Sequence, residues 1–255
     1  MIGLEFFVLP VLGLVVGVFG TMVGIGGGFL VVPILIVAFG FEPRIAVGTS
    51  LVYVFFNALS GSLGYLKQKR VNIHMGLMFA ILTIPGSILG AYVTGYFKHG
   101  LFQVVFAILL VATSLYLVIR PIKEKAASRL SDKHTNDVKF EGKVYNHTPS
   151  ITKGLIISFC AGFVSSIFGV GGGILHVPTM IFLLEFPVHI STATSHFIII
   201  FSSILGSLSH ASLGNVKLDF ALLLALGGIF GAQLGALVSQ KTKGTTTLEQ
   251  WFGKT

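Results

Sequence analysis

Long apolar stretches separated by short polar connections run through most of this chain. Five stretches are each about 20 residues long or longer, which is the length an α-helix needs to cross the hydrocarbon core of a membrane. They are residues 45–66, 72–97, 99–119, 188–213 and 217–240. The pattern predicts an all-α polytopic membrane protein with at least five spanning helices.

Two further apolar stretches, 4–41 and 151–186, are too long for one crossing and are interrupted by glycine. The interruptions are Gly24-Ile-Gly-Gly-Gly28 and Gly169-Val-Gly-Gly-Gly173. The pieces on either side are roughly 12 to 20 residues long, so each stretch forms either two short crossings or two half-helices of a re-entrant hairpin. Both arrangements return the chain to the side from which it started.

The two glycine clusters belong to an internal repeat, since each residue of the second follows its counterpart in the first by 145 residues. The same offset relates Pro33 to Pro178, Thr49-Ser50 to Thr194-Ser195, Gly61-Ser62-Leu63 to Gly206-Ser207-Leu208, and Leu89-Gly90-Ala91 to Leu234-Gly235-Ala236. Chance glycines would not keep one offset over such a distance, so we expect two homologous halves.

The repeat gives the expected organisation of the chain. We expect a first transmembrane repeat at 1–119, a polar loop at 120–150, a second transmembrane repeat at 151–243 and a polar tail at 244–255. If each broken stretch returns to its own side, the first half crosses the membrane an odd number of times. The second half then lies upside down, as in the inverted-topology repeats with broken helices that are typical of secondary transporters.

The basic residues indicate the orientation. With both broken stretches returning, fourteen Lys and Arg residues lie on one face and three on the other, against twelve and five if each stretch crosses once. Cytoplasmic loops hold the excess of Lys and Arg, so we expect the 120–150 loop and the C-terminus to be cytoplasmic in an inner membrane.

Composition agrees with a membrane protein and excludes other classes. Apolar residues make up 53% of the chain and charged residues 10%, against about 25% charged in soluble domains. The net charge of +8 comes from residues between the apolar stretches, so it indicates no nucleic-acid partner. The single cysteine, Cys160, excludes an internal disulfide.

The glycine clusters are the first candidates for a binding site. A glycine turn that leads into a helix presents free backbone N–H groups and a partial positive charge to a small anion. The candidate residues are Gly26, Gly27, Gly28, Gly171, Gly172 and Gly173. The alternative is that these glycines only allow close helix packing.

Hydroxyl and amide side chains that follow the glycine clusters are the next candidates. Thr49, Ser50, Thr194 and Ser195 repeat in register and are able to donate hydrogen bonds to an oxyanion, and Asn57 adds an amide donor opposite Ser202. The alternative for the hydroxyls is helix capping or hydrogen bonding between helices.

Three histidines break the repeat symmetry, since His176, His196 and His210 stand opposite Val31, Leu51 and Tyr65. An ionisable residue in a membrane segment indicates function, and His196 and His176 are candidates for proton coupling. His210 is expected near a membrane face. No Asp, Glu, Lys or Arg lies deep in a segment, so we expect neither a metal nor a cofactor, and an anion rather than a cation as substrate.

Two other function classes stay open. A passive channel is one. The other is an intramembrane hydrolase in which a serine from one helix meets His176 or His196 from another; Ser195 and His196 are neighbours on a helix and do not face each other. The chain lacks the G-x-S-x-G motif, and we expect no enzyme activity.

The paired elements Gly24-Ile-Gly-Gly-Gly-Phe-Leu-Val-Val-Pro33 and Gly169-Val-Gly-Gly-Gly-Ile-Leu-His-Val-Pro178, with the following Thr-Ser pairs, resemble the TauE/SafE sulfite exporter family. The resemblance covers residues 5 to about 240. It implies secondary transport of a small sulfur-containing anion, such as sulfite, thiosulfate or an organosulfonate, across an inner membrane. Residues 244–255 depart from the symmetry, because they are polar where the matching residues open the apolar stretch 99–119.

Overall fold

The computed structural model describes residues 2–97, 99–119, 138–140, 143–145, 151–184 and 186–241. In chain order the elements are α1 (Ile2–Val23), α2 (Gly28–Val37), α3 (Pro43–Lys67), α4 (Ile73–Thr94), α5 (His99–Ile119), β1 (Val138–Phe140), β2 (Lys143–Tyr145), α6 (Ile151–Phe168), α7 (Gly173–Phe182), α8 (Val188–Ser212) and α9 (Leu218–Lys241). The predicted all-α polytopic membrane fold is confirmed, because five of the described helices are long and apolar enough to cross a membrane.

The predicted spans coincide with helices. Four of them correspond to α3, α4, α8 and α9, which each contain a candidate span, and α1 adds a fifth candidate at Phe6–Val23. The predicted span 99–119 corresponds to the apolar helix α5, which has 21 residues.

Both broken stretches are interrupted at the glycine clusters, as the sequence predicts. α1 ends at Val23 and α2 begins at Gly28, while α6 ends at Phe168 and α7 begins at Gly173. α2 and α7 have 10 residues each. At 1.5 Å per residue they are about 15 Å long, roughly half of the hydrocarbon thickness, so neither crosses the membrane alone.

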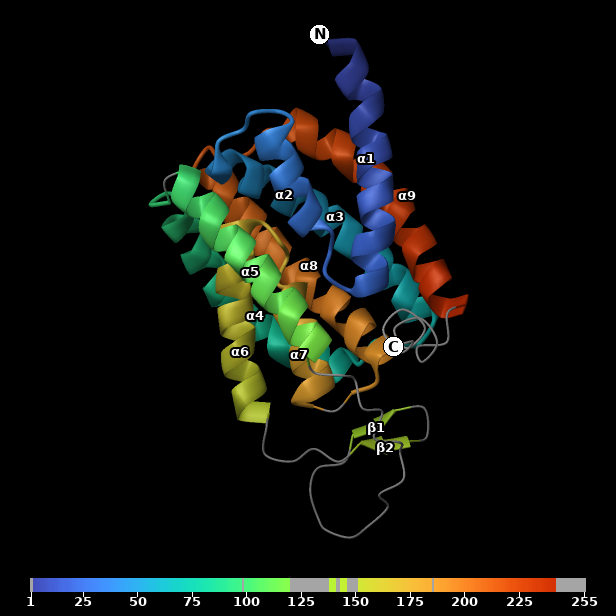
Figure 1. Cartoon of the computed structure of the whole chain (residues 1–255). Helices are drawn as coiled ribbons and strands as arrows, with labels where there is room; N and C mark the ends of the chain where they lie inside the picture. Colours follow the sequence, from blue (N-terminus) through green and yellow to red (C-terminus); the bar gives the residue numbers. More distant parts are fainter. Residues whose placement is uncertain are drawn as a thin grey trace.

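The two broken pairs run in opposite directions through the molecule. In Figure 1, α1 descends from the N-terminus and α2 returns upward, whereas α6 rises and α7 returns downward. The long helices α3 and α8 pass between them. Both glycine breaks therefore lie in the interior of the bundle rather than at its ends.

Little of the predicted polar loop 120–150 belongs to the described residues. Within it, β1 and β2 form an antiparallel hairpin in which Val138 pairs with Tyr145. The rest of that loop and the predicted tail 244–255 lie outside the described residues.

The halves pack against each other through glycines that repeat in register. A Cβ built at Gly86 on α4 would meet the carbonyl oxygen of Phe159 on α6, and one built at Gly231 on α9 would meet that of Leu14 on α1. Each glycine and each carbonyl differs from its counterpart by 145 positions. Helix packing through small residues is typical of membrane proteins, because lipid gives the helices no hydrophobic reason to associate.

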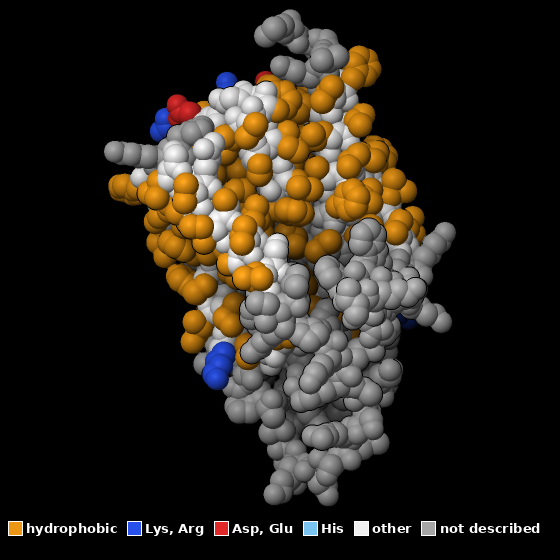
Figure 2. Space-filling view, viewed as in Figure 1, with side chains coloured by type: hydrophobic (Ala, Val, Ile, Leu, Met, Phe, Trp, Pro, Cys, Tyr) orange, Lys and Arg blue, Asp and Glu red, His pale blue; other side chains and the backbone are white. Residues whose placement is uncertain are grey.

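The lateral surface of the described part is apolar. Large hydrophobic side chains such as Phe7, Phe19, Ile81, Val111 and Phe230 are more than half exposed. Figure 2 shows hydrophobic side chains over the middle of the described surface, with charged ones only towards its upper and lower ends. This distribution fits a protein whose sides contact lipid and whose ends contact water.

We predict that Gly86→Ala lowers the melting temperature of the protein in detergent. Alanine normally favours a helix over glycine, but here the added carbon overlaps the Phe159 carbonyl and forces α4 from α6, at a cost of about 1–3 kcal/mol. Gly100→Ala is the matched control, because nothing lies within 4 Å of the added carbon. A melting temperature that falls equally in both variants, or in neither, would contradict this packing.

Candidate functional site

Two short glycine turns lie where the broken helices meet. The first glycine turn comprises residues 24–27 and the second comprises residues 169–172. Gly27 and Gly172 cap the following helices with the same backbone angles, φ 83° and ψ −12°. These left-handed angles are costly for any residue with a Cβ, which explains why glycine is needed at both caps.

The two turns contact each other directly, and glycine is also needed for that reason. A Cβ at Gly28 would meet the carbonyl oxygen of Gly169, and a Cβ at Gly173 would meet that of Gly24. The first residue of each half-helix therefore lies against the backbone of the opposite turn. In this structure no space for even a methyl group separates them.

Two serines hydrogen-bond the turns across the halves. Ser50 Oγ on α3 donates to the carbonyl oxygen of Gly169 at 2.9 Å. Ser195 Oγ on α8 donates to the carbonyl oxygen of Gly24 at 3.0 Å. Both serines are fully buried, and each half supplies the hydroxyl for the turn of the other half.

The neighbouring threonines make a second reciprocal pair of contacts. Thr49 Oγ1 accepts a hydrogen bond from the backbone N–H of Lys217, and Thr194 Oγ1 accepts one from that of Asn72, both at 3.0 Å. Thr49 lies near the start of α3 and Lys217 beyond the end of α8, so these two helices run antiparallel. Both threonines thus hydrogen-bond the backbone of a connection between two helices and not a glycine turn.

Asn57 lies at the first glycine turn. Its Nδ2 atom donates to the carbonyl oxygen of Gly26 at 3.2 Å and to Thr21 Oγ1 at 3.4 Å. Its Oδ1 atom is buried and accepts no hydrogen bond from the described residues. At the second turn, Ser202 Oγ donates to the carbonyl oxygen of Gly171 at 3.0 Å. The asymmetry expected from the sequence thus places a larger amide group at one turn only.

His196 joins the polar group around the first turn. Its Nε2 atom lies 3.3 Å from Thr21 Oγ1, which also receives the contact from Asn57. The imidazole packs edge to face with Tyr65, with 6.0 Å between the ring centroids. His196 comes from the second half, so this buried group spans both halves.

His176 makes its contacts within the second half. Its Nδ1 atom lies 3.0 Å from the carbonyl oxygen of Gly172, and its Nε2 atom lies 3.2 Å from Ser158 Oγ. Both ring nitrogens therefore have partners. The second contact brings a buried serine and a histidine within hydrogen-bonding distance, which is the geometry that a hydrolase requires of its nucleophile and base.

His210 is fully buried within the protein and lies in the last turn of α8, two residues before the helix ends. Its Nε2 atom lies 2.9 Å from the carbonyl oxygen of Ser166. Tyr65, its counterpart in the first half, donates to the carbonyl oxygen of Thr21 at 2.7 Å. Since Ser166 is the counterpart of Thr21, the two side chains form the same helix-to-helix contact, and we assign His210 a structural part.

Several backbone N–H groups of the two turns are buried without an acceptor in the described part of the chain. Within the described residues, the N–H groups of Gly27, Gly28, Gly172 and Gly173 donate to no acceptor. These groups lie at the positive ends of the α2 and α7 dipoles, where a negative charge is stabilised. The N–H of Gly171, Asn57 Oδ1 and His196 Nδ1 also have no hydrogen-bond partner among the described residues, although buried polar groups usually have one.

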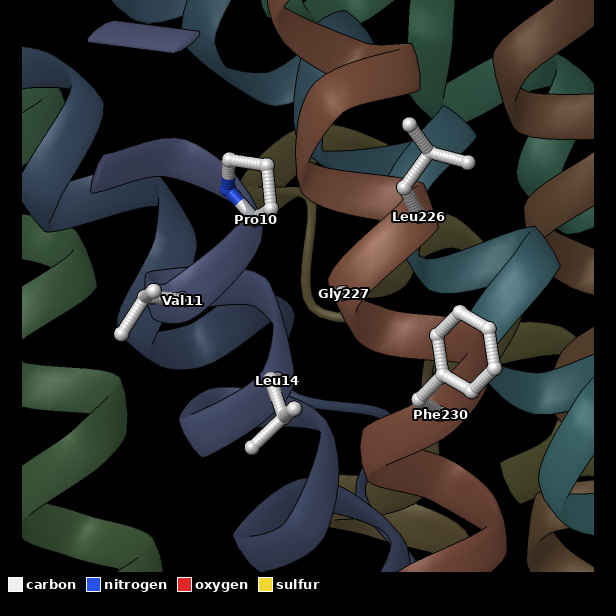
Figure 3. A pocket seen from close by; sticks show the side chains of 6 residues that line it. All are labelled: Pro10, Val11, Leu14, Leu226, Gly227 and Phe230. Carbon is white, nitrogen blue, oxygen red and sulfur yellow. The ribbon is translucent and has the colours of Figure 1, made fainter. Parts of the chain in front are cut away.

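A pocket of about 210 Å³ lies away from this centre, between α1 and α9. Figure 3 shows its lining, which comprises Pro10, Val11, Leu14, Leu226, Gly227 and Phe230. None of these side chains offers a polar atom, so the pocket suits an apolar group and not an anion.

Two residues of this region were missed by the sequence analysis. Thr21 lies before the first glycine cluster. Only the 145-residue offset that relates it to Ser166 could have indicated it as a candidate. The sequence analysis treated Arg70 only as one of the basic residues in the connections between helices. In the structure Arg70 is 9% exposed, and its guanidinium carbon lies 5.2 Å from the centre of the Tyr65 ring. Its backbone turn folds it back onto the bundle, which the sequence pattern does not reveal.

Known proteins provide an independent comparison. The sequence model of the sulfite exporter TauE/SafE family matches residues 9–253. The chain is 39% identical over 254 residues to "Probable membrane transporter protein YunE" of Bacillus subtilis, covering 95% of this chain and 92% of that protein. It is 31% identical over 248 residues to "Probable membrane transporter protein MJ0441" of Methanocaldococcus jannaschii, covering 91% and 86%.

No solved structure matches this chain. The family match spans nearly the whole sequence, including both glycine turns and the helices that surround them. The chain belongs to the sulfite exporter TauE/SafE family.

Proposed function

We propose that this protein is a secondary transporter that moves a small sulfur-containing anion, such as sulfite, thiosulfate or an organosulfonate, across the inner membrane. The observation that supports this most is the pair of glycine turns, which contact each other in the interior and are hydrogen-bonded by serines of the opposite halves. The family description and the names of the relatives agree with a membrane transporter.

The proposed mechanism depends on two halves with inverted topology. The reciprocal contacts of Ser50 and Ser195, and the antiparallel course of α3 and α8, support this arrangement. In inverted repeats the two halves can exchange conformations, which opens a central site to one side and then to the other. We assign the halves to residues 1–119 and 151–243.

The anion is held by neutral donors in this proposal. The N–H groups of Gly27, Gly28, Gly172 and Gly173 lie at the N-terminal ends of α2 and α7. Gly26 and Gly171 shape the turns through their positive φ angles. Neutral donors and helix dipoles suit an ion that must be released again, because they bind less tightly than a paired charge. Asn57 and His196 lie beside the first turn, so they contribute to the same site.

In this proposal the contact between the two turns belongs to a closed form of the site. Binding then requires the turns to separate, which breaks the contacts of Ser50 and Ser195 with the carbonyl oxygens of Gly169 and Gly24. The released hydroxyls become available to the oxygens of the anion. The serines thus act twice, first holding the turns together and then binding the anion.

The expected orientation belongs to the proposal as well. The connection after α3 contains Lys67, Lys69 and Arg70, and the segment 120–150 and the C-terminal residues contain most of the other basic residues. By the positive-inside rule these parts lie in the cytoplasm.

We predict that purified protein in liposomes takes up radiolabelled sulfite or thiosulfate, with saturation and without ATP. Uptake should rise when unlabelled anion is enclosed, because exchange returns the site to the outside, whereas a passive channel shows no such acceleration. Sulfate and chloride are the comparison ions. Uptake of none of these anions, or selective movement of a metal cation, would contradict the proposal.

Covalent labelling of Ser158 by a serine-reactive probe would instead favour the intramembrane hydrolase.

Ser50→Ala and Ser195→Ala should each lower anion exchange about tenfold. Each removes one donor from a buried carbonyl and from the anion, and a lost charge-assisted hydrogen bond has about this effect. Ser203→Ala is the matched control, because this buried hydroxyl bonds only within its own helix, to the carbonyl oxygens of Ile199 and Ile200. Equal exchange rates in all three variants would show that the serines only cap or pack.

His196→Gln should flatten the pH dependence of transport measured from about pH 5 to 8, because glutamine cannot take up a proton as an imidazole does. The assay needs thiosulfate or an alkanesulfonate, whose own charge is constant over this range. His176→Gln is the comparison, because its imidazole contacts only the second half, and it should leave the profile in place. An unaltered profile for His196→Gln would remove this residue from proton coupling.

A further inference from the structure

Arg70 occupies an unusual place for a charged residue of a connection. The left-handed conformation of Lys69, with φ 56°, turns the chain so that the N–H of Arg70 donates to the carbonyl oxygen of Tyr65 at 3.1 Å. The guanidinium donates to Gln68 Oε1 at 3.1 Å and to the carbonyl oxygen of His189 at 3.3 Å. The cation is thus held at the inner wall of the bundle instead of in water.

A continuous series of contacts leads from Arg70 to the first glycine turn. The guanidinium lies over the ring of Tyr65, which also contacts His196 and the carbonyl oxygen of Thr21. His196 and Asn57 then meet at Thr21 Oγ1, and Asn57 reaches the carbonyl oxygen of Gly26. Each step is an interaction between buried groups.

The opposite end of the molecule repeats the backbone of this arrangement but not its chemistry. Gly214, with φ 72°, takes the place of Lys69, and the N–H of Asn215 donates to the carbonyl oxygen of His210 at 2.9 Å. Asn215 is the counterpart of Arg70, and Leu51 that of His196. The equivalent series of positions therefore has an uncharged amide in place of the guanidinium and an aliphatic side chain in place of the imidazole.

The two series of contacts begin near opposite ends of α3. Arg70 follows the end of that helix, whereas the connection containing Asn215 is bonded through Lys217 to Thr49 near its start. α3 has 25 residues, so the ends are about 37 Å apart. Lys67 and Lys69 add positive charge near Arg70, while Arg44 at the far end is paired with Glu42 at 2.7 Å. Lys217 also lies at the far end, two residues from Asp219, so the net positive charge of the described connections is concentrated at the α3–α4 end.

We propose that Arg70 receives the anion at the α3–α4 end of the transporter and passes it along Tyr65 and His196 to the first glycine turn, so that recognition is one-sided. This inference rests on the function proposed above. A guanidinium matches sulfite, thiosulfate and sulfonate because its planar N–H groups bond two oxygens at once. Partial burial strengthens its field, which raises the local anion concentration at this entrance.

The test measures the KM for radiolabelled sulfite separately in right-side-out and inside-out membrane vesicles. Arg70→Gln should raise the KM about tenfold at the α3–α4 end and leave it within about twofold at the other end. Arg70→Lys should recover only part of the loss, because an ammonium lacks the planar fork. Lys67→Gln removes an equal charge from an exposed neighbour and should change the KM much less.

Asn215→Arg tests the same idea without altering Arg70, and so remains informative if Arg70→Gln does not fold. It should lower the KM at the α8–α9 end, where the backbone already has the matching shape. An Arg70→Gln protein with normal melting temperature and unchanged KM on both sides would overturn the inference, as would an unchanged KM in Asn215→Arg. Absence of sulfite or thiosulfate transport by the unaltered protein would instead overturn the proposed function itself.

Discussion

The direct contact of two backbone turns in the middle of the bundle determines most of what surrounds it. Gly28 and Gly173 lie against the carbonyl oxygens of Gly169 and Gly24, and no larger residue fits. Two buried carbonyls in a low-dielectric interior require donors, and the hydroxyls of Ser50 and Ser195 supply them from the opposite halves. At this contact the first N–H groups of both half-helices have no acceptor among the described residues, and such groups are able to stabilise an anion.

The same constraint explains why the halves are interleaved. α1 packs on α9 and α4 packs on α6, so each half is covered by helices of the other. Glycines such as Gly86 and Gly231 allow backbone to touch backbone at these interfaces, and in lipid such contacts replace the hydrophobic effect as the source of association. In the proposed mechanism, helices packed in this way move together when the turns separate.

Much of this architecture follows from the sequence, because membrane helices and repeats leave strong periodic signals. The 145-residue register predicted both breaks and paired Ser50 with Ser195 as equivalent residues. It did not predict that each serine bonds the turn of the other half, since a register gives correspondence and not contact. Arg70 and Thr21 were missed for a similar reason: only the backbone turn at Lys69 and the helix crossings bring them to His196. The functions of the candidate residues stay predictions.

In the proposed mechanism, the differences between the two halves of the repeat determine how the site works. Asn57, His196 and Arg70 stand where the other half has Ser202, Leu51 and Asn215. The most direct test of the central claim is a crystal structure with selenite, the selenium analogue of sulfite, located by its anomalous scattering. The account predicts a selenium position whose oxygens lie about 3 Å from the amides of Gly27, Gly28, Gly172 or Gly173, with the two turns separated. Selenium bound only at surface lysines and arginines, with the turns still in contact, would contradict it.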